Sequence, residues 1–449
     1  MTVTTVNLED EAPALDASFA RARAESSPDW LAQRRRAAWD AYESLPSPSS
    51  QRDEDWRRTD VSGLQPSRFR PIDDVDQGML ASMVEQWDRA EPNAALAIDA
   101  PGARAVNDAD ALLAQGVIIT SLEEAAALHP DLVQRALAGV AVDESKFVAL
   151  WNAMWRGGIF VHVPNGVDAL APVWIAHPAS GDSRAVFPAT VVVLGDAASL
   201  TVVDAFASPP DGHELFSDAT TVMVAGRDAH LDYIALQQWG DRTWHIATHR
   251  ATLGAQARLR FFAATLGARL QKAYWDVILD GVGAEADIAG VCFGEQDQHL
   301  DHQSLQAHRA AETRSNLLLK VAVRDRARSV YSGLIDVAPE AVHADGYVQN
   351  RNLILSHGAK ADSVPRLEIR ANDVRCGHGA TAGHIDDDQR FYFMSRGVPR
   401  EDADSLIVRG FMDDAIARVP HPGVARLIAG LLDAEVAGEP QVGLAEVTA

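Results

Sequence analysis

The chain has 449 residues, a formal net charge of −23 and only two cysteines. This length allows about two to four domains, or one elongated repeat architecture with appendages. The acidic balance argues against free nucleic acid or an anionic membrane as a partner, since both require a basic surface. No apolar stretch reaches the ~18 residues of a membrane span, and no secretory signal pattern opens the chain, so we expect a protein of the reducing cytoplasm.

The first region, residues 1–156, is predicted to be mainly helical. Apolar residues recur at helical spacing over residues 15–45, and helical signals return over residues 108–153. Between them, residues 53–60 indicate a turn or short strand in which Trp56 serves as a packing anchor.

Residues 157–385 show a different pattern, in which a short apolar run is followed by a Gly or Asp turn and then a small residue. Residues 191–200 and 222–231 are two clear instances. Strands that recur so often with little helix between them predict an all-β repeat stack. Small residues after each turn suit a corner at which neighbouring coils pass closely. A β-helix or solenoid fits this repeating turn, and a large barrel is the alternative.

Residues 386–449 are predicted to be helical again. Pro399 should open a helix with acidic residues in its first turn, and Pro420 should end it. Apolar residues from Ala403 to Ile416 would form one broad stripe on this helix. The sequence therefore predicts a mainly β region between two helical ones.

Cys376 and His378 form the strongest chemical pattern. In an extended strand, residues i and i+2 point to the same face, so a thiol and an imidazole would lie side by side. This pair suits iron, zinc or copper, but two ligands do not complete a metal site. The alternative is a buried cysteine that behaves as a small apolar residue, beside a hydrogen-bonded histidine.

His299, Asp301, His302 and His308 form a second polar cluster. His299 and Asp301 would share a strand face, whereas His302 would lie on the other. We interpret the cluster as polar residues on a solvated β face, because no third ligand can be placed for a metal. Cys292 lies in an apolar run and is predicted to belong to the core.

The sequence contains no complete active site. It lacks the phosphate-binding loop Gly-x-x-x-x-Gly-Lys-Ser/Thr, the dinucleotide fingerprint Gly-x-Gly-x-x-Gly after a strand, and the Gly-x-Ser-x-Gly nucleophile turn. No carboxylate pair is isolated enough to indicate glycosidase chemistry. The protein is therefore expected to be neither an ATPase nor an enzyme of these classes.

A series of short motifs runs in order through residues 299–416. They are His-Gln-Ser at 302–304, Tyr-Ser-Gly-Leu-Ile at 331–335, Asn-Arg-Asn-Leu-Ile-Leu-Ser at 350–356, Ala-Asp-Ser-Val-Pro-Arg-Leu-Glu-Ile at 361–369, Asp-Val-Arg-Cys-Gly-His-Gly-Ala-Thr at 373–381 and Phe-Tyr-Phe-Met-Ser-Arg-Gly-Val-Pro at 391–399. Glu-Asp-Trp-Arg-Arg-Thr at 54–59 precedes them. The whole series resembles the SufB/SufD family of the SUF iron–sulfur cluster assembly system.

Within this family the chain is similar to the SufD branch. The SufB branch supplies a sulfur-accepting cysteine from a strand upstream of the terminal motif, but here no cysteine lies between Cys292 and Cys376. Where SufB tends to read Glu-His-Glu, this chain reads Gly-His-Gly around His378.

The resemblance implies a right-handed parallel β-helix flanked by helical domains, and a heterodimer with SufB formed through edge strands of the β-helix. His378 is the first candidate ligand for iron or for a transient iron–sulfur cluster shared with SufB, and Cys376 is the second. No metal or cluster is expected to stay on the isolated chain. A homodimer is possible when SufB is absent.

The resemblance also implies a SufC ATPase docked on the C-terminal helical domain, so that the chain would be a non-catalytic scaffold subunit of a SufBCD complex. The helix of residues 400–418 and the turn before it would form the docking surface. Its predicted contact residues are Arg396, Leu406, Arg409 and Phe411. Two other functions remain open: a parallel β-helix enzyme acting on carbohydrate, and a stand-alone iron-binding module.

Overall fold

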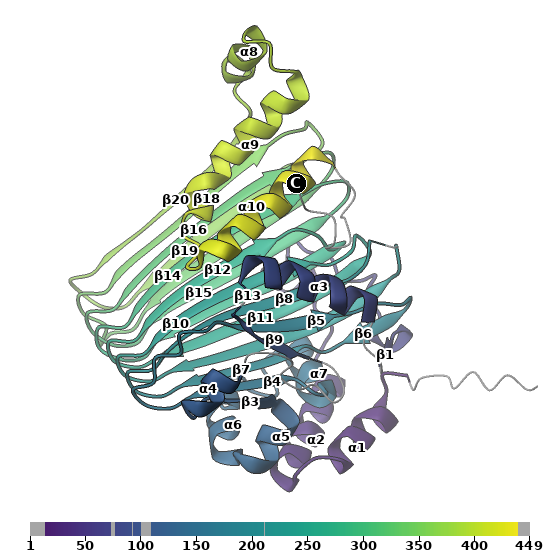
Figure 1. Ribbon diagram of the computed structural model, residues 1–449, viewed down its shortest axis with the longest axis vertical. Helices are drawn as coiled ribbons and strands as arrows, with labels where there is room; N and C mark the ends of the chain where they lie inside the picture. Colours follow the sequence, from purple (N-terminus) through teal and green to yellow (C-terminus); the bar gives the residue numbers. More distant parts are fainter. Residues whose placement is uncertain (1–13, 73–76, 92, 100–108, 211, 439–449) are drawn as a thin grey trace, which may run out of the picture.

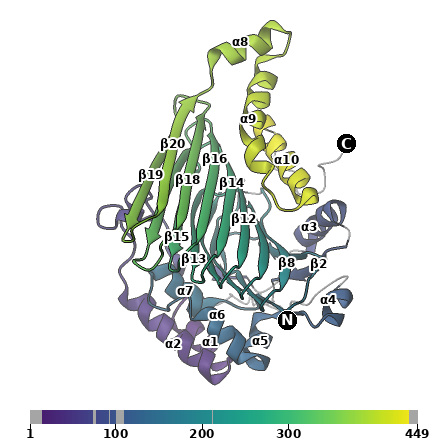
Figure 2. The same cartoon turned by 90° about the vertical axis from the view of Figure 1, so that its left-hand side faces the viewer.

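The computed structural model describes residues 14–72, 77–91, 93–99, 109–210 and 212–438. Parallel strands wind into a β-helix with two long sheets (Figures 1 and 2). Most helices of the N-terminal region gather at one end, and the last helices lie along one sheet and project beyond the other end. The predicted parallel β-helix between helical regions is confirmed, and the barrel alternative is wrong.

The first sheet has 11 strands, and its neighbours pair in parallel except β3 with β4. Its main path runs through β3 (Ile118–Ser121), β4 (Ile159–Val163), β7 (Ala189–Leu194), β9 (Leu215–Ala225), β11 (Thr243–Leu253), β13 (Leu270–Leu279), β15 (His299–His308), β17 (Arg328–Val337) and β19 (Lys360–Ile369). Beside this path, β1 (Arg70–Pro71) pairs with β6 (Arg184–Val186), which pairs with β9.

The second sheet has nine strands, all parallel. Its order is β2 (Ala95–Ile98), β5 (Val173–Pro178), β8 (Ser199–Ala207), β10 (His230–Gln238), β12 (Arg258–Thr265), β14 (Glu285–Gly294), β16 (Arg314–Val323), β18 (Asp345–Ile354) and β20 (Arg375–His384). Because the chain alternates between the two sheets, β19 and β20 are the last strand of each.

The corners between strands explain the repeating turn pattern of the sequence. Asp228 and Gln256 have left-handed φ angles of 56° and 59°. Each is followed by a fully buried alanine, Ala229 and Ala257. The left-handed residue turns the chain sharply, and the small residue after it fits against the next coil.

Alternating side chains separate an interior from an outer face. Leu231 and Leu259 pair in register on β10 and β12 and lie in the core inside the β-helix. Ile234 and Phe262 pair in the same ladder with the opposite parity, and they belong to a separate core on the outer face. Apolar residues at both parities therefore reflect a sheet covered on both sides.

The N-terminal helices are α1 (Ala17–Glu25), α2 (Asp29–Ser44), α3 (Gln77–Ala90), α4 (Asp110–Ala114), α5 (Leu122–Leu128), α6 (Pro130–Leu137) and α7 (Lys146–Met154), with short 3-10 turns η1 (Glu54–Trp56) and η2 (Pro66–Arg68). Every residue of α7 after Lys146 is buried, and the helix joins this region to the β-helix. Its Trp151 indole donates to the carbonyl of Pro188 at 2.9 Å.

The C-terminal helices are α8 (Asp387–Ser395), α9 (Arg400–Ile416) and α10 (Pro422–Ala437). As predicted, α9 begins directly after Pro399 and ends before Pro420. Together with α3, α9 and α10 cover part of the outer face of the second sheet, whereas α8 projects beyond the last strands (Figure 2). No helix in the described part of the chain is long and apolar enough to cross a membrane.

Candidate functional site

The β-helix ends in two edge strands: β19 is the last strand of the first sheet and β20 is the last strand of the second. Each has a neighbouring strand on one side only. Arg375 N–H donates to the carbonyl of Ala344 on the β18 side at 2.8 Å. Alternate residues of a parallel strand bond to the same neighbour, so the backbone groups of Cys376, His378 and Ala380 face the open edge. Such an edge is a template on which a strand of another chain can pair.

Cys376 and His378 lie on the inner side of β20. Their partners in register on β18 are Gly346 and Val348, and Val348 belongs to the interior core. No further coil of the described residues covers β20. His378 is exposed and Cys376 is half-buried, packed against the edge of that core. The thiol and the imidazole therefore share one face, as their spacing predicted.

The environment of Cys376 disfavours its thiolate. Burial raises the pKa of the thiol, and the backbone N–H of Gly346 opposes this increase only in part. At neutral pH the group is therefore a thiol, and a metal must displace its proton to bind sulfur. The exposed imidazole of His378 is the more accessible of the two donors.

The open end offers no complete metal site of its own. Among the described residues, no group of three or more His, Cys, Asp or Glu side chains could hold a metal ion. A thiolate and an imidazole are donors that iron accepts, alone or within a cluster. A metal bound to this pair would therefore need further ligands that the described residues do not supply.

Apolar residues accompany these donors at the open end. On β19, Leu367 and Ile369 are 37% and 42% exposed, and their register partners on β17, Ile335 and Val337, are fully buried in the interior core. Apolar residues that would be buried in an inner coil are therefore partly exposed to solvent in the last coil. Exposed apolar surface beside an unpaired edge is typical of surfaces through which proteins associate.

The second polar cluster is not on a solvated face, so that interpretation is wrong. His302 is fully buried, and its Nε2 lies 3.0 Å from the hydroxyl of Thr265. His308 is also fully buried and contacts the hydroxyls of Thr313 and Ser315, both at 2.8 Å. Burial lowers the pKa of both histidines to about 4, so they are neutral structural groups of the interior.

Asp301 is buried because the N-terminal segment crosses the outer face of the first sheet. Its carboxylate binds the ammonium of Lys272 at 2.6 Å and accepts a hydrogen bond from Thr59. The same ammonium donates to the carbonyl of Asp55 at 2.5 Å and lies 4.9 Å from the centre of the Trp56 ring. The Glu-Asp-Trp-Arg-Arg-Thr motif is therefore an anchor that fixes the N-terminal segment to the β-helix, and Trp56 packs as predicted.

Two of the predicted contact residues on α9 have partners within the chain. The Arg409 guanidinium lies 3.0 Å from a carboxylate oxygen of Asp433 on α10. The half-buried Phe411 ring lies 4.6 Å from the ammonium of Lys320 on β16. Both residues fasten α9 to its neighbours, and a second role in docking stays a prediction.

The large apolar side chains that are exposed in the C-terminal region lie on α8 and on the neighbouring part of α9. Leu406 on α9 is 46% exposed, and Arg396 lies over the Tyr392 ring at 5.2 Å. Phe391 and Met394 on α8 are 71% and 46% exposed. Sequence reasoning did not choose Phe391, Tyr392 or Met394 as contacts, although an aromatic run in an otherwise polar helix could have indicated them.

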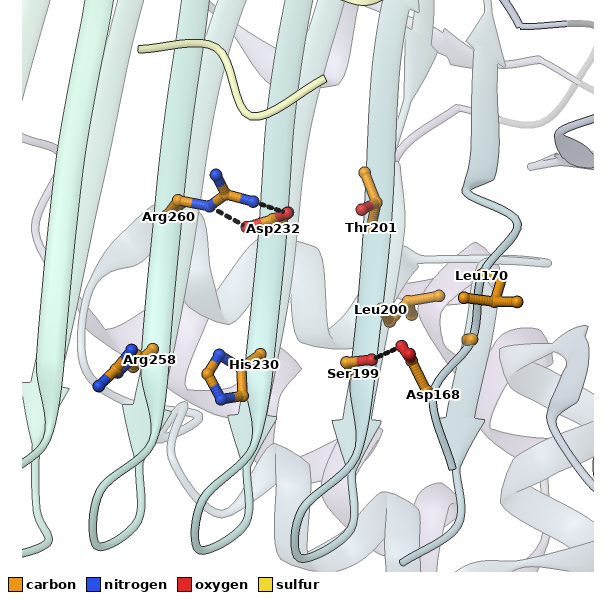
Figure 3. Close-up of a pocket in the computed structure, with 10 residues that line it drawn as sticks. Asp168, Leu170, Ser199, Leu200, Thr201, His230, Asp232, Arg258 and Arg260 are labelled. Carbon is orange, nitrogen blue, oxygen red and sulfur yellow. Dashed lines mark hydrogen bonds and ion pairs between the residues drawn. The ribbon is translucent and has the colours of Figure 1, made fainter. Parts of the chain in front are cut away.

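A groove of about 490 Å³ lies on the outer face of the second sheet (Figure 3). Its carboxylates are already bonded: Asp168 accepts from Ser199, and Asp232 binds the Arg260 guanidinium, with Nε at 2.6 Å. Hydrolysis of a glycosidic bond needs a pair of carboxyl groups free to act on the substrate. The groove therefore gives no support to a carbohydrate-active enzyme.

A buried charge network lies in the first coils of the β-helix, at the other end from β19 and β20. His177 lies between two carboxylates, 2.9 Å from Asp99 and 2.6 Å from Asp204. Asp204 also accepts from the Tyr233 hydroxyl at 2.7 Å. Burial alone would lower the pKa of His177, but the two carboxylates outweigh it and raise this pKa to about 9.

Comparison with known proteins identifies two family profiles that match this chain. The profile described as "SUF system FeS cluster assembly, SufBD core domain" matches residues 177–411, and the profile of the "SufBD protein N-terminal region" matches residues 102–175. The core profile alone covers more than half of the chain.

Curated relatives carry the name "Iron-sulfur cluster assembly SufBD family protein". One from Staphylococcus epidermidis is 25% identical over 307 residues, which is 68% of this chain and 66% of its own length. One from Mycobacterium leprae is 37% identical over 212 residues, 45% of this chain and 54% of its own length. The chain thus spans just under two thirds of the first relative and about half of the second.

The core profile begins in β5 and ends within α9, so it includes the open edge with Cys376 and His378. The N-terminal profile ends two residues before it. On this evidence the protein belongs to the SufB/SufD family of the SUF iron–sulfur cluster assembly system.

Proposed function

We propose that this chain is the SufD-type subunit of a cytoplasmic SufBCD scaffold complex, and that an iron–sulfur cluster is built where it meets SufB. The observation that carries the proposal is the open end of the β-helix. It combines an unpaired strand edge, exposed core residues and an incomplete set of metal donors, and a second chain would satisfy all three.

Iron, or the nascent cluster, is the cargo of this interface and not a resident group. His378 is the first ligand in the proposal because its imidazole is exposed at the edge. Cys376 is the second, and it becomes a ligand only when a metal displaces the proton of its thiol. A site divided between two chains opens when they separate, which would allow the cluster to leave.

The assignment to SufD and not SufB is supported by the residues around these donors. No cysteine occurs between Cys292 and Cys376, and glycines flank His378 on both sides. Cys292 is fully buried in the interior, where burial raises its pKa, so its thiol is poorly suited to accept sulfur from another protein.

The projecting α8 and the exposed side of α9 are the proposed docking surface for the SufC ATPase. Phe391, Tyr392, Met394 and Leu406 give this surface an apolar character. Because α8 follows β20 after only two residues, movement of a docked ATPase would act directly on the strand that carries His378. In this role the chain is a scaffold and the ATPase supplies the catalysis.

Co-purification of the tagged chain with SufB and SufC tests the proposal. We expect all three proteins to elute together. Two results would contradict the shared site: a chain that stays alone in the presence of both partners, or an isolated chain that binds Fe(II) tightly at one equivalent through His378. The second result would favour the stand-alone iron-binding module.

A substitution of Leu406 by Glu tests the docking surface separately. A charge on this apolar surface should weaken association with SufC by tenfold or more and leave association with SufB unchanged. Leu170→Glu is the matched control, because Leu170 is 83% exposed in the groove on the second sheet, away from α8 and α9. Equal SufC affinity of both variants and the wild type would place the docking surface elsewhere.

A further inference from the structure

Two histidines outside the proposed cluster site lie together at the joint between the β-helix and α8. His357 is in the turn that leads from β18 to β19, and His384 is the last residue of β20. The centres of their imidazole rings are 5.9 Å apart. Both side chains are exposed.

The backbone fixes both positions. His384 pairs in register with Ile354 in the ladder between β18 and β20. His357 follows Ile354 by three residues, in a turn closed by a hydrogen bond of 3.2 Å from Ala359 N–H to the carbonyl of Ser356. A Cβ added to Gly358 would lie 2.5 Å from the carbonyl oxygen of Asp325, so this turn rests directly on the coil below. The two histidines are therefore held near each other by the sheet and not by a flexible loop.

We propose that His357 and His384 form a two-histidine chelate for a borderline divalent transition metal such as Zn²⁺. Metal–nitrogen bonds of about 2.1 Å place two ligating rings with centres roughly 4.5–6.5 Å apart, depending on the angle at the metal. The observed separation lies within this range. Within the described part of the chain neither imidazole takes part in a hydrogen bond or an ion pair, so both are available as ligands.

The two histidines would fill only two coordination positions of the metal. No third His, Cys, Asp or Glu among the described residues completes a metal-binding group. The remaining coordination positions would be filled by water, as in metal sites that keep exchangeable ligands. Imidazole nitrogen selects metals of the zinc, copper and nickel type over Mg²⁺ and Ca²⁺, which prefer oxygen ligands.

The position of the chelate gives it a mechanical consequence. A bound metal would link the turn between β18 and β19 to the point at which β20 passes into α8. The projecting helix would then be tethered to the last coil at its base. Metal occupancy should therefore restrain the C-terminal helices relative to the β-helix.

Calorimetric titration of the full chain with Zn²⁺ tests this proposal. The titration uses the Cys376→Ala, His378→Ala double variant as background, so that the proposed cluster ligands contribute nothing to the signal. We expect one equivalent of Zn²⁺ to bind, and His357→Ala or His384→Ala to weaken that binding by about tenfold or more. His343→Ala, which removes another exposed histidine near the same end, should leave the affinity unchanged.

Hydrogen exchange gives the second readout. Zn²⁺ should slow amide exchange in residues 385–395 of the background chain, and should not do so after His384→Ala. Unchanged Zn²⁺ affinity in both single variants would overturn the proposal, as would binding that His343→Ala abolishes. These results do not depend on SufB or on cluster assembly, so failure here is distinguishable from failure of the proposed function.

Discussion

Within the described residues, polar groups have partners at one end of the β-helix and lack them at the other. We call the first coils, around His177, the closed end, and the last coil, with β19 and β20, the open end. At the closed end, Asp99 accepts hydrogen bonds from the backbone of Gly158 and Ala189 and binds His177, which in turn binds Asp204. His177 and Asp204 are buried, the Asp99 side chain is only 5% exposed, and each of the three has a partner. At the open end, Cys376 and His378 lie on the last strand, where the described residues supply no further metal ligand.

The difference shows that the polar groups of the closed end are satisfied within the described part of the chain, whereas those of the open end are not. Buried charges are tolerated only when they are paired and hydrogen-bonded, and the closed end satisfies this requirement within one chain. At the open end, by contrast, edge backbone groups, apolar residues of the last coil and two metal donors face solvent without a partner among the described residues. A second chain is the simplest way to satisfy them together.

The largest effect is expected at the closed end. Asp204→Asn removes one charge of a buried pair and should lower the free energy of unfolding by about 3–5 kcal/mol, as measured by urea denaturation. Asp232→Asn is the control, because its ion pair with Arg260 lies on the outer face and should be worth no more than about 1 kcal/mol. Equal losses in both variants would show that the buried network does not stabilise the closed end.

The same network predicts a loss of stability at alkaline pH. The folded pKa of His177, about 9, lies above that of an unfolded histidine, so its contribution is complete below about pH 6.5 and disappears as the pH rises through 9. The free energy of unfolding, measured by urea denaturation, should fall by an amount on the order of 1–3 kcal/mol between pH 7 and 10. In Asp204→Asn this alkaline slope should be smaller, and an unchanged slope would assign it to other groups.

At the open end, a smaller change should affect association and not folding. Ala380→Pro removes an N–H donor that faces the free edge, so it should weaken binding to SufB by tenfold or more. The free energy of unfolding of the isolated chain should change by no more than about 1 kcal/mol. Ala380→Ser keeps the donor and is the matched control for sedimentation measurements. Normal binding by the proline variant would exclude pairing through this part of β20.

The repeat architecture could be predicted from the sequence because its turns are chemically distinctive. A Gly or Asp turn followed by a small residue marks many of the corners. Asp228 with Ala229 shows why, because Asp228 turns the chain and Ala229 fits against the next coil. Cys376 and His378 could be placed on one strand face for the same local reason, since their separation of two residues determines it.

The burial of polar residues could not be predicted, because alternation does not reveal what covers each face. Asp301 looked solvated, yet a segment more than 200 residues earlier in the chain buries it and pairs it with Lys272. His302 points into the β-helix interior, where Gln271 and Thr265 bond to it. The His177 network joins three segments whose contacts depend on the winding of the coils, and no short motif marks it.

The smallest expected effect on stability belongs to the residue on which the account depends most. His378→Ala should change the free energy of unfolding by no more than about 0.5 kcal/mol, because the side chain is exposed. In the complex reconstituted with SufB and SufC, the same variant should lose most of its iron content and cluster yield, whereas His230→Ala should retain both. Wild-type cluster yield from a His378→Ala complex of normal composition would contradict the claim that the open end completes its metal site with a second chain.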